Sequence, residues 1–116
     1  MPIVYRDRDL LELIVELIGH IQRRLDNVQR SDFLHDADEI DLTSFRLLHI
    51  GEATHKLSSD IKSRHAHIPW IDIHGMRDIV SHDYFGVDPG IIWMTATTKL
   101  DEMLVMCRAE LDTLAE

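Results

Sequence analysis

Residues 10–28 read LLELIVELIGHIQRRLDNV, and this stretch decides the class of fold. Its apolar residues recur at steps of three and four, and they are Leu10, Ile14, Leu17, Ile18, Ile21, Leu25 and Val28. Charged residues such as Glu12, Glu16 and Arg23 occupy much of the other side. A period near 3.6 with one apolar side predicts an amphipathic helix of about five turns.

A second helix is expected after a polar break that surrounds Phe33. It should run from near Asp41 or Thr43 to Ser63, because apolar residues again recur along one side. Gly51 lies inside this helix, where a glycine lowers helix stability by about 1 kcal/mol relative to alanine. A glycine in that place indicates the close approach of another helix.

Two further helices follow. Pro69 is well placed in the first turn of a third helix, which should reach about Tyr84. Asp88 and Pro89 predict the N-cap and the first residue of a last helix, with an interruption near residues 95–98. No segment alternates with a period of two, so the sequence predicts an all-α fold, an antiparallel bundle of four to five helices.

The composition limits the class of protein. A chain of 116 residues is expected to form one domain, residues 1–116. The net charge of −9, from 21 acidic residues against 12 Lys and Arg, excludes a histone-like nucleic-acid binder. The single cysteine, Cys107, falls on the apolar side of the last helix and predicts a core residue in a reducing, cytoplasmic setting. No apolar run approaches the ~20 residues of a membrane span, so no membrane contact is expected.

The eight histidines raise the question of a metal site. Glu52 and His55 have the Glu-x-x-His spacing of dinuclear iron bundles, with His49 on the same helix. Such a centre needs a second Glu-x-x-His and two more facing glutamates, which the sequence does not offer. Loops of the kind that bind nucleotide phosphates are also missing. The sequence therefore predicts no metal site and no cofactor.

Potentially reactive side chains gather in residues 76–84, MRDIVSHDY. On a helix, Arg77, Ser81 and Tyr84 share one side, and Asp78 and His82 form a pair four residues apart beside them. An arginine that grips a phosphate and a histidine that moves protons near pH 7 suit phosphodiester cleavage. RNA supplies its own nucleophile in the 2′-OH, so no metal is required. The alternative is an ordinary solvated helix surface with weak ion pairs.

The spacing Arg77-x4-His82-x-Tyr84 resembles the Arg-x4-His-x-Tyr motif of HepT-like toxins in the HEPN superfamily of helical domains. Further blocks follow the pattern of that family in order, and they are IGEA at 50–53, IPW at 68–70, MRD at 76–78, HDYFGVD at 82–88 and Trp93. The likeness spans essentially the whole chain. Each block alone is weak, but jointly they are specific.

The resemblance implies the toxin of a toxin–antitoxin pair, acting as a metal-independent endoribonuclease. It implies a homodimer in which the two motif helices meet in a shared cleft. Arg77 would bind the scissile phosphate, His82 would act as general base or acid, and Asp78 would be the polar residue that follows the arginine. It also implies a partner, a minimal nucleotidyltransferase antitoxin that transfers AMP from ATP to Tyr84. Attack by the 2′-OH would leave 2′,3′-cyclic phosphate ends, and Ser81 would support the site.

Several alternatives remain open at this level. Glu52 either holds Arg77 or His82, or is only a structural partner at a tight crossing by Gly51. Residues 62–77 carry a positive balance, as a local RNA-binding surface or as a solvated loop. The acidic composition favours a rival function, a binding or adaptor subunit of the nucleotidyltransferase with weak or no cleavage. A nucleotide-binding module that uses Arg77 for a phosphate of ATP is a third possibility.

Overall fold

The computed structural model describes residues 6–82 and 88–115, without the side chains of Met76 and residues 78–82. This part of the chain holds seven helices and no strand, so the predicted all-α fold is confirmed. The five longer helices are α1 (Asp7–Leu25), α3 (Ala37–Lys56), α5 (Trp70–His82), α6 (Pro89–Thr98) and α7 (Asp101–Ala115). The two short ones are α2 (Arg30–Phe33) and α4 (Ser59–Arg64).

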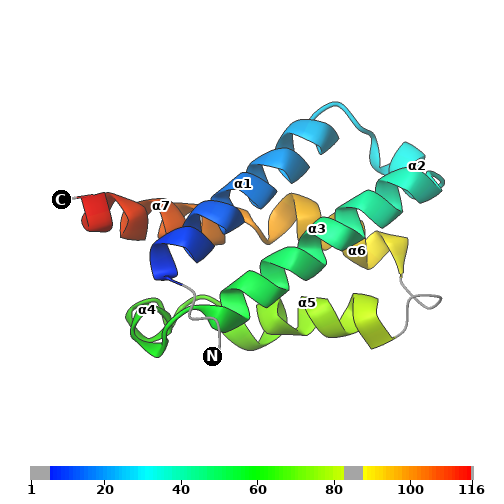
Figure 1. Cartoon of the computed structure of the whole chain (residues 1–116). Helices are drawn as coiled ribbons and strands as arrows, with labels where there is room; N and C mark the ends of the chain where they lie inside the picture. Colours follow the sequence, from blue (N-terminus) through cyan, green and yellow to red (C-terminus); the bar gives the residue numbers. More distant parts are fainter. Residues whose placement is uncertain (1–5, 83–87, 116) are drawn as a thin grey trace.

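Helix α3 is the centre of the bundle (Figure 1). It packs on α1 along one side and on α5 along the other, and α6 and α2 also touch it. The three helices α1, α3 and α5 run in alternating directions, and α7 packs along α1 (Figure 1). Among the described helices, α5 makes extensive contact only with α3. The helix that carries the motif therefore lies at the edge of the fold.

The apolar side of α1 forms the core, as its period predicts. Leu11, Ile14 and Ile18 are fully buried, and Leu17 packs against the core in part. Val28, expected on the same side of this helix, lies beyond its end at Leu25 and is also partly buried. Other helices add side chains with almost no exposed surface, and these are Phe33, Leu47, Ile50, Met103 and Cys107. Complete burial of one large apolar side chain contributes about 1.5–3 kcal/mol, so these residues dominate the stability of the bundle. Cys107 is a core residue, as predicted.

The expected bounds of the second helix are wrong at both ends, and capping explains the difference. Helix α3 begins earlier, because the Asp36 carboxylate accepts the backbone N–H of Glu39 at 3.2 Å and caps it. It ends at Lys56, and α4 starts anew with Ser58 as N-cap. The Ser58 hydroxyl accepts from the backbone N–H of Ile61 at 3.4 Å. The backbone N–H of Ser58 donates to the Asp7 carboxylate at 3.0 Å.

The later helices follow the expectation more closely. Helix α5 begins directly after Pro69, and its expected end near Tyr84 lies outside the described residues. Asp88 is the N-cap of α6, since its carboxylate accepts the backbone N–H of Gly90 at 2.8 Å. The predicted interruption is present, but at residues 99–100. Within the described part of the chain, none of the helices has the length and apolar content that a membrane crossing requires.

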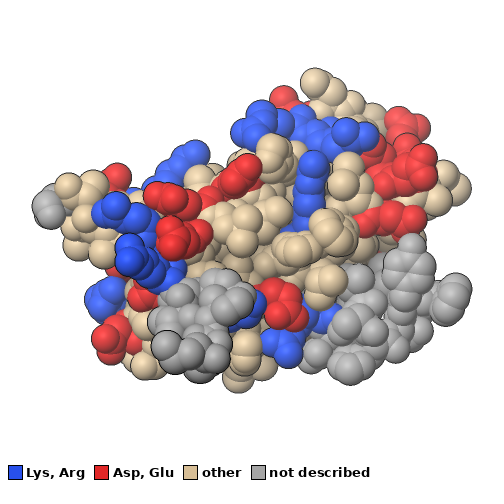
Figure 2. Space-filling view, in the orientation of Figure 1, with Lys and Arg blue, Asp and Glu red and all other residues tan. Residues whose placement is uncertain are grey.

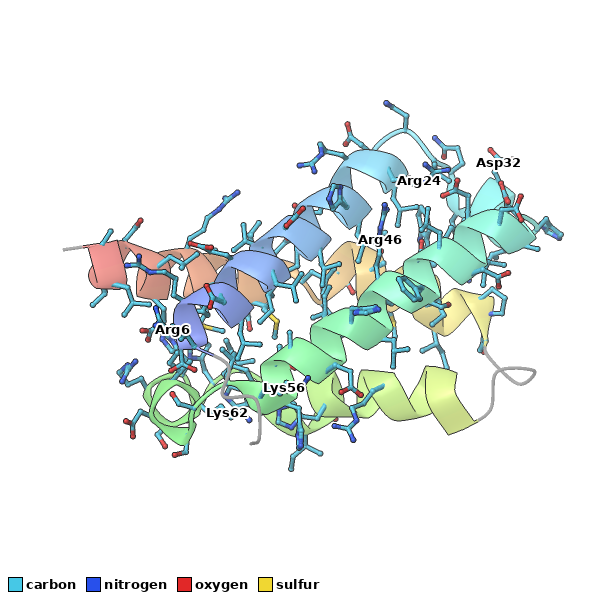
Figure 3. All side chains as sticks on the ribbon, viewed as in Figure 1. Arg6, Arg24, Asp32, Arg46, Lys56 and Lys62 are labelled. Carbon is cyan, nitrogen blue, oxygen red and sulfur yellow. The ribbon has the colours of Figure 1, made fainter. Side chains whose placement is uncertain are left out.

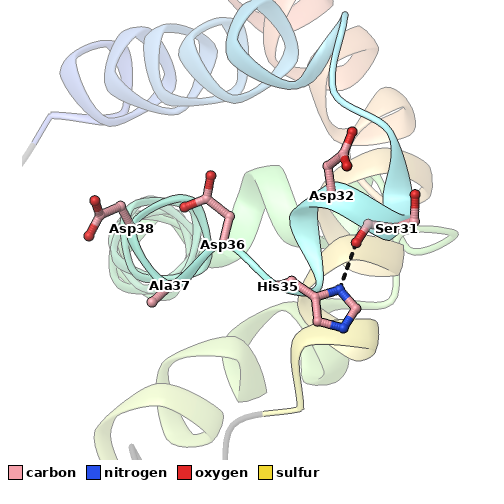
Figure 4. A pocket seen from close by; sticks show the side chains of 6 residues that line it. All are labelled: Ser31, Asp32, His35, Asp36, Ala37 and Asp38. Atoms are coloured by element: carbon pink, nitrogen blue, oxygen red, sulfur yellow. Dashed lines mark hydrogen bonds between the residues drawn. The ribbon is translucent and has the colours of Figure 1, made fainter.

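The polar break around Phe33 folds into α2 and a hollow of about 480 Å³ beside it (Figure 4). The hollow is lined by Ser31, Asp32, His35, Asp36, Ala37 and Asp38. The Nδ1 atom of His35 lies 2.9 Å from the Ser31 carbonyl oxygen, the bond drawn in Figure 4. Three carboxylates around one hollow repel phosphate, so this surface is unsuited to the RNA backbone.

Candidate functional site

The candidate site starts where α3 and α5 cross at Gly51. A methyl group on Gly51 would lie 3.3 Å from the backbone nitrogen of Arg77 and 3.3 Å from the carbonyl oxygen of Ile73. Both are backbone atoms of α5, so any side chain at position 51 would push the two helices slightly apart, and glycine allows this close approach. The close helix contact predicted from Gly51 is confirmed. The crossing fixes the backbone of Arg77 against α3.

Glu52, the next residue along α3, contacts the Arg77 side chain. Its Oε1 atom lies 3.4 Å from the Nε atom of Arg77. The side chains of Arg77 and Glu52 are 34% and 44% exposed, so the pair is open to solvent. The two alternatives for this region therefore coincide, because Gly51 makes the tight crossing and Glu52 reaches the arginine. A guanidinium in this setting is accessible to a phosphate that competes with the carboxylate.

An aromatic cluster lies one helical turn before Arg77. The ring of His74 packs edge-on against His55 of α3, with centroids 5.2 Å apart, and lies 6.3 Å from the Trp70 ring. Burial lowers the pKa of His74, and the nearby Lys62 and His55 lower it further. Its Nε2 atom is buried and has no hydrogen-bond partner among the described residues. A neutral, packed His74 thus supports the turn of α5 that precedes Arg77.

Two lysines lie at the end of the molecule where α3 ends and α5 begins (Figure 3). The Nζ atom of Lys62 donates to the carbonyl oxygen of His55 at 3.0 Å. Burial lowers the pKa of Lys62, and the Asp7 carboxylate opposes this effect. Lys56 is exposed at the last residue of α3. The positive side of the site therefore consists of side chains from α3, α4 and α5.

Arg64, which adds to the positive balance of residues 62–77, has a partner of its own. Its Nε and Nη2 atoms each donate to the Glu110 carboxylate at 3.0 Å, and the His65 Nε2 atom lies 2.7 Å from the same group. Hydrogen bonds from Arg64 lower the pKa of the Glu110 carboxyl, burial opposes them, and His65 adds to the lowering. The charge of Arg64 is thus balanced by α7. The stretch does not act as one uniform positive surface.

The remaining motif residues are placed only by their backbone. Asp78, Ser81 and His82 belong to α5, and their side chains lie outside the description, while Tyr84 lies wholly outside the described residues. On a continuous helix, positions five residues apart are separated by about 140° around the axis. The positions of Arg77 and His82 in one chain therefore lie on different sides of α5.

The histidines with metal-like spacing have ring neighbours. His49 packs on Phe45, with ring centroids 4.4 Å apart, and His55 packs on His74. These contacts between rings were not expected from the sequence. The contact of Phe45 with His49 was readable, because residues four apart share one side of a helix. The contact of His55 with His74 joins α3 and α5 and has no such local signal.

The distribution of charge matches this arrangement (Figure 2). Acidic side chains gather at the right of the view, over α2 and the start of α3 (Figure 2). Glu52 of α3 and Arg77 of α5 bring an acidic and a basic group together where the two helices cross. A net charge of −9 is therefore spread unevenly, and the crossing is less acidic than the α2 end.

Fold and motif together define the class of protein. The chain is an all-α bundle, and its edge helix α5 carries Arg77 and His82 of the Arg-x4-His-x-Tyr motif. This combination is that of a HEPN-type helical domain. The family description "Ribonuclease HepT-like" matches residues 14–110, and the chain belongs to this family.

Relatives with assigned names support the same family. The "Probable ribonuclease HepT" of Thermococcus cleftensis is 38% identical over 100 residues, which cover 83% of this chain and 87% of that protein. A protein of Caldanaerobacter subterraneus subsp. tengcongensis named as a candidate RNase is 33% identical, over 83% of this chain and 86% of its own length. A similarly named protein of Methanocaldococcus jannaschii is 34% identical, over 82% of this chain and 75% of its own length. No solved structure gives a significant match.

Proposed function

We propose that the chain is an endoribonuclease that cleaves RNA without a metal ion, through Arg77 and His82. The observation that carries the proposal is Arg77, held against α3 at a solvent-open edge of the fold in a chain of the HepT-like ribonuclease family. An RNase activity also agrees with the names of the relatives.

The proposed chemistry is an internal transfer at phosphorus. Arg77 binds the scissile phosphate and balances the charge that develops on its oxygens. His82 takes the proton of the 2′-OH, the bond from O2′ to phosphorus forms, and the bond from phosphorus to O5′ breaks. A protonated histidine then supplies a proton to the leaving O5′, which gives a 2′,3′-cyclic phosphate and a 5′-OH. Asp78 orients the imidazole or Arg77, and Ser81 supports the site.

The proposed active form is a homodimer. Helix α5 makes extensive contact only with α3 among the described helices, and Ile71 on it is 86% exposed. Beside it lies a hollow of about 450 Å³, lined by Pro69, Ile71, Asp72, Ile73, Gly75, Thr95 and Lys99. A second copy against this side of α5 would cover apolar surface. Because the positions of Arg77 and His82 lie on different sides of α5, a cleft shared by two chains would take the arginine from one chain and the histidine from the other.

The proposed biological role is that of a toxin in a toxin–antitoxin pair. A minimal nucleotidyltransferase antitoxin would add AMP to Tyr84, seven residues after Arg77. The phosphate of that AMP would compete with RNA for the arginine and obstruct the cleft. Removal of either Arg77 or His82 should then relieve growth arrest, with little change in melting temperature.

The decisive experiment incubates the purified chain with total RNA in EDTA, beside His82→Ala and His67→Ala prepared identically. His67 is exposed and outside the motif, so His67→Ala is the matched control. We expect discrete fragments with cyclic phosphate ends from the parent and from His67→Ala, and none from His82→Ala. Equal cutting by all three would contradict the role of His82, and inhibition by EDTA would contradict the metal-independent mechanism.

A second candidate function is a binding or adaptor subunit for the nucleotidyltransferase. The observation that favours it is the ion pair between Glu52 and Arg77, because this carboxylate competes with an RNA phosphate for the arginine. If the unmodified parent cuts no RNA while mass spectrometry shows that the partner adds AMP to Tyr84, the adaptor function replaces the nuclease.

A further inference from the structure

Phe45 is an exposed aromatic residue on the central helix. Its side chain is 57% exposed, whereas Leu47 and Ile50 of the same helix are buried and Ile40, Leu42 and Leu48 are half-buried. A single exposed apolar side chain is common on protein surfaces and needs no explanation by itself. Phe45 is not isolated, however, because the His49 ring packs on it with centroids 4.4 Å apart and a tilt of 57°. Two rings therefore form one exposed aromatic surface on α3.

This aromatic surface shares a side of α3 with the candidate site. At about 100° per residue, Phe45, His49 and Glu52 fall within an arc of about 60°, with Lys56 in the same arc. Along the axis, Glu52 lies about 5 Å from His49 and about 10 Å from Phe45. Glu52 contacts Arg77, so the aromatic pair and the arginine are neighbours across one exposed stripe.

The charges along the stripe favour one direction for a nucleic-acid strand. Lys56 lies at its far end, beyond the Arg77–Glu52 pair (Figure 3). Asp41 lies one turn before Phe45, towards the acidic α2 end of the molecule. A phosphate is favoured near Arg77 and Lys56 and disfavoured beyond Phe45. The charges on the aromatic half of the stripe are thus compatible with one base and unfavourable for a longer run of phosphates.

From this geometry we infer that Phe45 and His49 form a stacking subsite for one unpaired base of the RNA, next to the phosphate bound by Arg77. The inference rests on the proposed function, since it names the form of RNA that the same site takes. Proteins recognise single-stranded RNA by stacking splayed bases on aromatic side chains, and such stacking tolerates any base. The substrate would be single-stranded at the cut, as in a loop or an end, and a paired duplex would bind poorly.

The test measures binding separately from cleavage. The full-length His82→Ala chain, alone or combined with Phe45→Ala, Phe45→Tyr or Val105→Ala, is titrated with a short labelled single-stranded RNA, and anisotropy gives Kd. A second RNA lacks one base beside the cleavage site mapped for the parent. Val105 is 69% exposed on α7, far along the chain from the stripe, and serves as the matched control.

We expect Phe45→Ala to raise Kd about tenfold, with Phe45→Tyr and Val105→Ala close to the His82→Ala reference. The missing base should weaken binding by a similar factor when Phe45 is present and have little further effect when it is absent. Equal Kd values for Phe45→Ala and the reference would overturn the stacking subsite. So would a rise in Kd for the RNA with the missing base that is the same with and without the Phe45 side chain.

Two further outcomes separate this inference from the proposed function. If RNA binds in a Phe45-dependent manner but the unmodified parent never cleaves it, the nuclease fails and the subsite stands. If the parent cleaves but Phe45→Ala alters only the molecular mass in solution, and not Kd, the ring belongs to an interface between copies and the subsite is wrong.

Discussion

The Nε atom of Arg77 lies 3.4 Å from the Oε1 atom of Glu52, so the candidate phosphate site already contains an anion of the protein itself. An RNA phosphate must share Arg77 with this carboxylate or displace it. The pair is half-exposed, and ion pairs of this kind contribute about 0–1 kcal/mol to stability. Its main effect is therefore on the affinity for RNA and on the orientation of Arg77.

Replacement of Glu52 by glutamine should tighten RNA binding. The amide keeps a hydrogen-bond acceptor near Arg77 but removes a negative charge close to the incoming phosphate. Loss of this repulsion should improve the binding free energy by roughly 1 kcal/mol, or lower Kd about fivefold. The melting temperature should change by no more than a few degrees. Glu12→Gln removes the same charge from an exposed position on α1 and should leave Kd nearly unchanged. Weaker binding by Glu52→Gln would show instead that the carboxylate is needed to position Arg77.

Alanine at Gly51 and at Gly75 should have opposite effects on stability. A methyl group at Gly51 meets two backbone atoms of α5 at 3.3 Å, so α5 must shift, at a cost of about 1 kcal/mol or more. Among the described residues, no atom other than those of the adjoining turns of α5 lies within 4 Å of such a methyl group at Gly75, and alanine there gains up to about 1 kcal/mol of helix propensity. Urea unfolding of the two variants and the parent at low protein concentration measures both values.

The contrary result for Gly75 would also be informative. If Gly75→Ala lowers stability, and does so more strongly as protein concentration rises, a second chain occupies the exposed side of α5. A loss that does not depend on concentration would contradict the open surface at Gly75. A gain in stability for Gly51→Ala would contradict the tight crossing.

The fold was predictable because its main signal is local. The period of α1 and the glycine at the crossing are both readable in the sequence, and so is the interruption before α7. The end of α3 was not, because the chain leaves the helix at Leu57, next to a backbone N–H of Ser58 that bonds to Asp7, 51 residues away. Asp36 begins α3 early in a stretch whose acidic residues lie on the surface, where periodicity of apolar residues gives no signal.

The candidate site was predictable only in part for a similar reason. The motif marks Arg77, and Gly51 with Glu52 indicated a contact to it. The pairing of Arg64 with Glu110 joins residues 46 apart, and no local pattern announces it. A positive run in a sequence gives the sum of the charges, whereas partners from distant helices decide how much of that charge faces solvent.

The Cys107 thiol should be almost unreactive in the folded chain. It has no exposed surface, and burial, aided by the charge of Glu110, raises its pKa to about 12. Since the thiolate is the reacting species, labelling by a disulfide reagent at pH 8 should be slower by on the order of 100-fold or more than in denaturant. Ala109→Cys places a thiol on an exposed position of α7 and should react quickly. Fast labelling of the parent in native buffer would mean that α7 opens readily.

The Glu110 carboxylate should make stability depend on pH in the acid range. Arg64 lowers its pKa, with a smaller contribution from His65 against the opposing effect of burial, so the unfolded chain binds this proton more tightly than the folded one. The stabilisation is complete above the ordinary pKa near 4.5 and is lost as the pH falls through the lower value of the folded state.

Glu110→Gln should be less stable than the parent by about 1–3 kcal/mol at pH 7, because the charge-assisted hydrogen bonds weaken. Urea unfolding from pH 7 down to pH 3 should show this difference shrinking below pH 4.5, while the exposed Glu102→Gln stays parallel to the parent. A difference that is constant over the whole range would mean that Glu110 stabilises the bundle by packing alone.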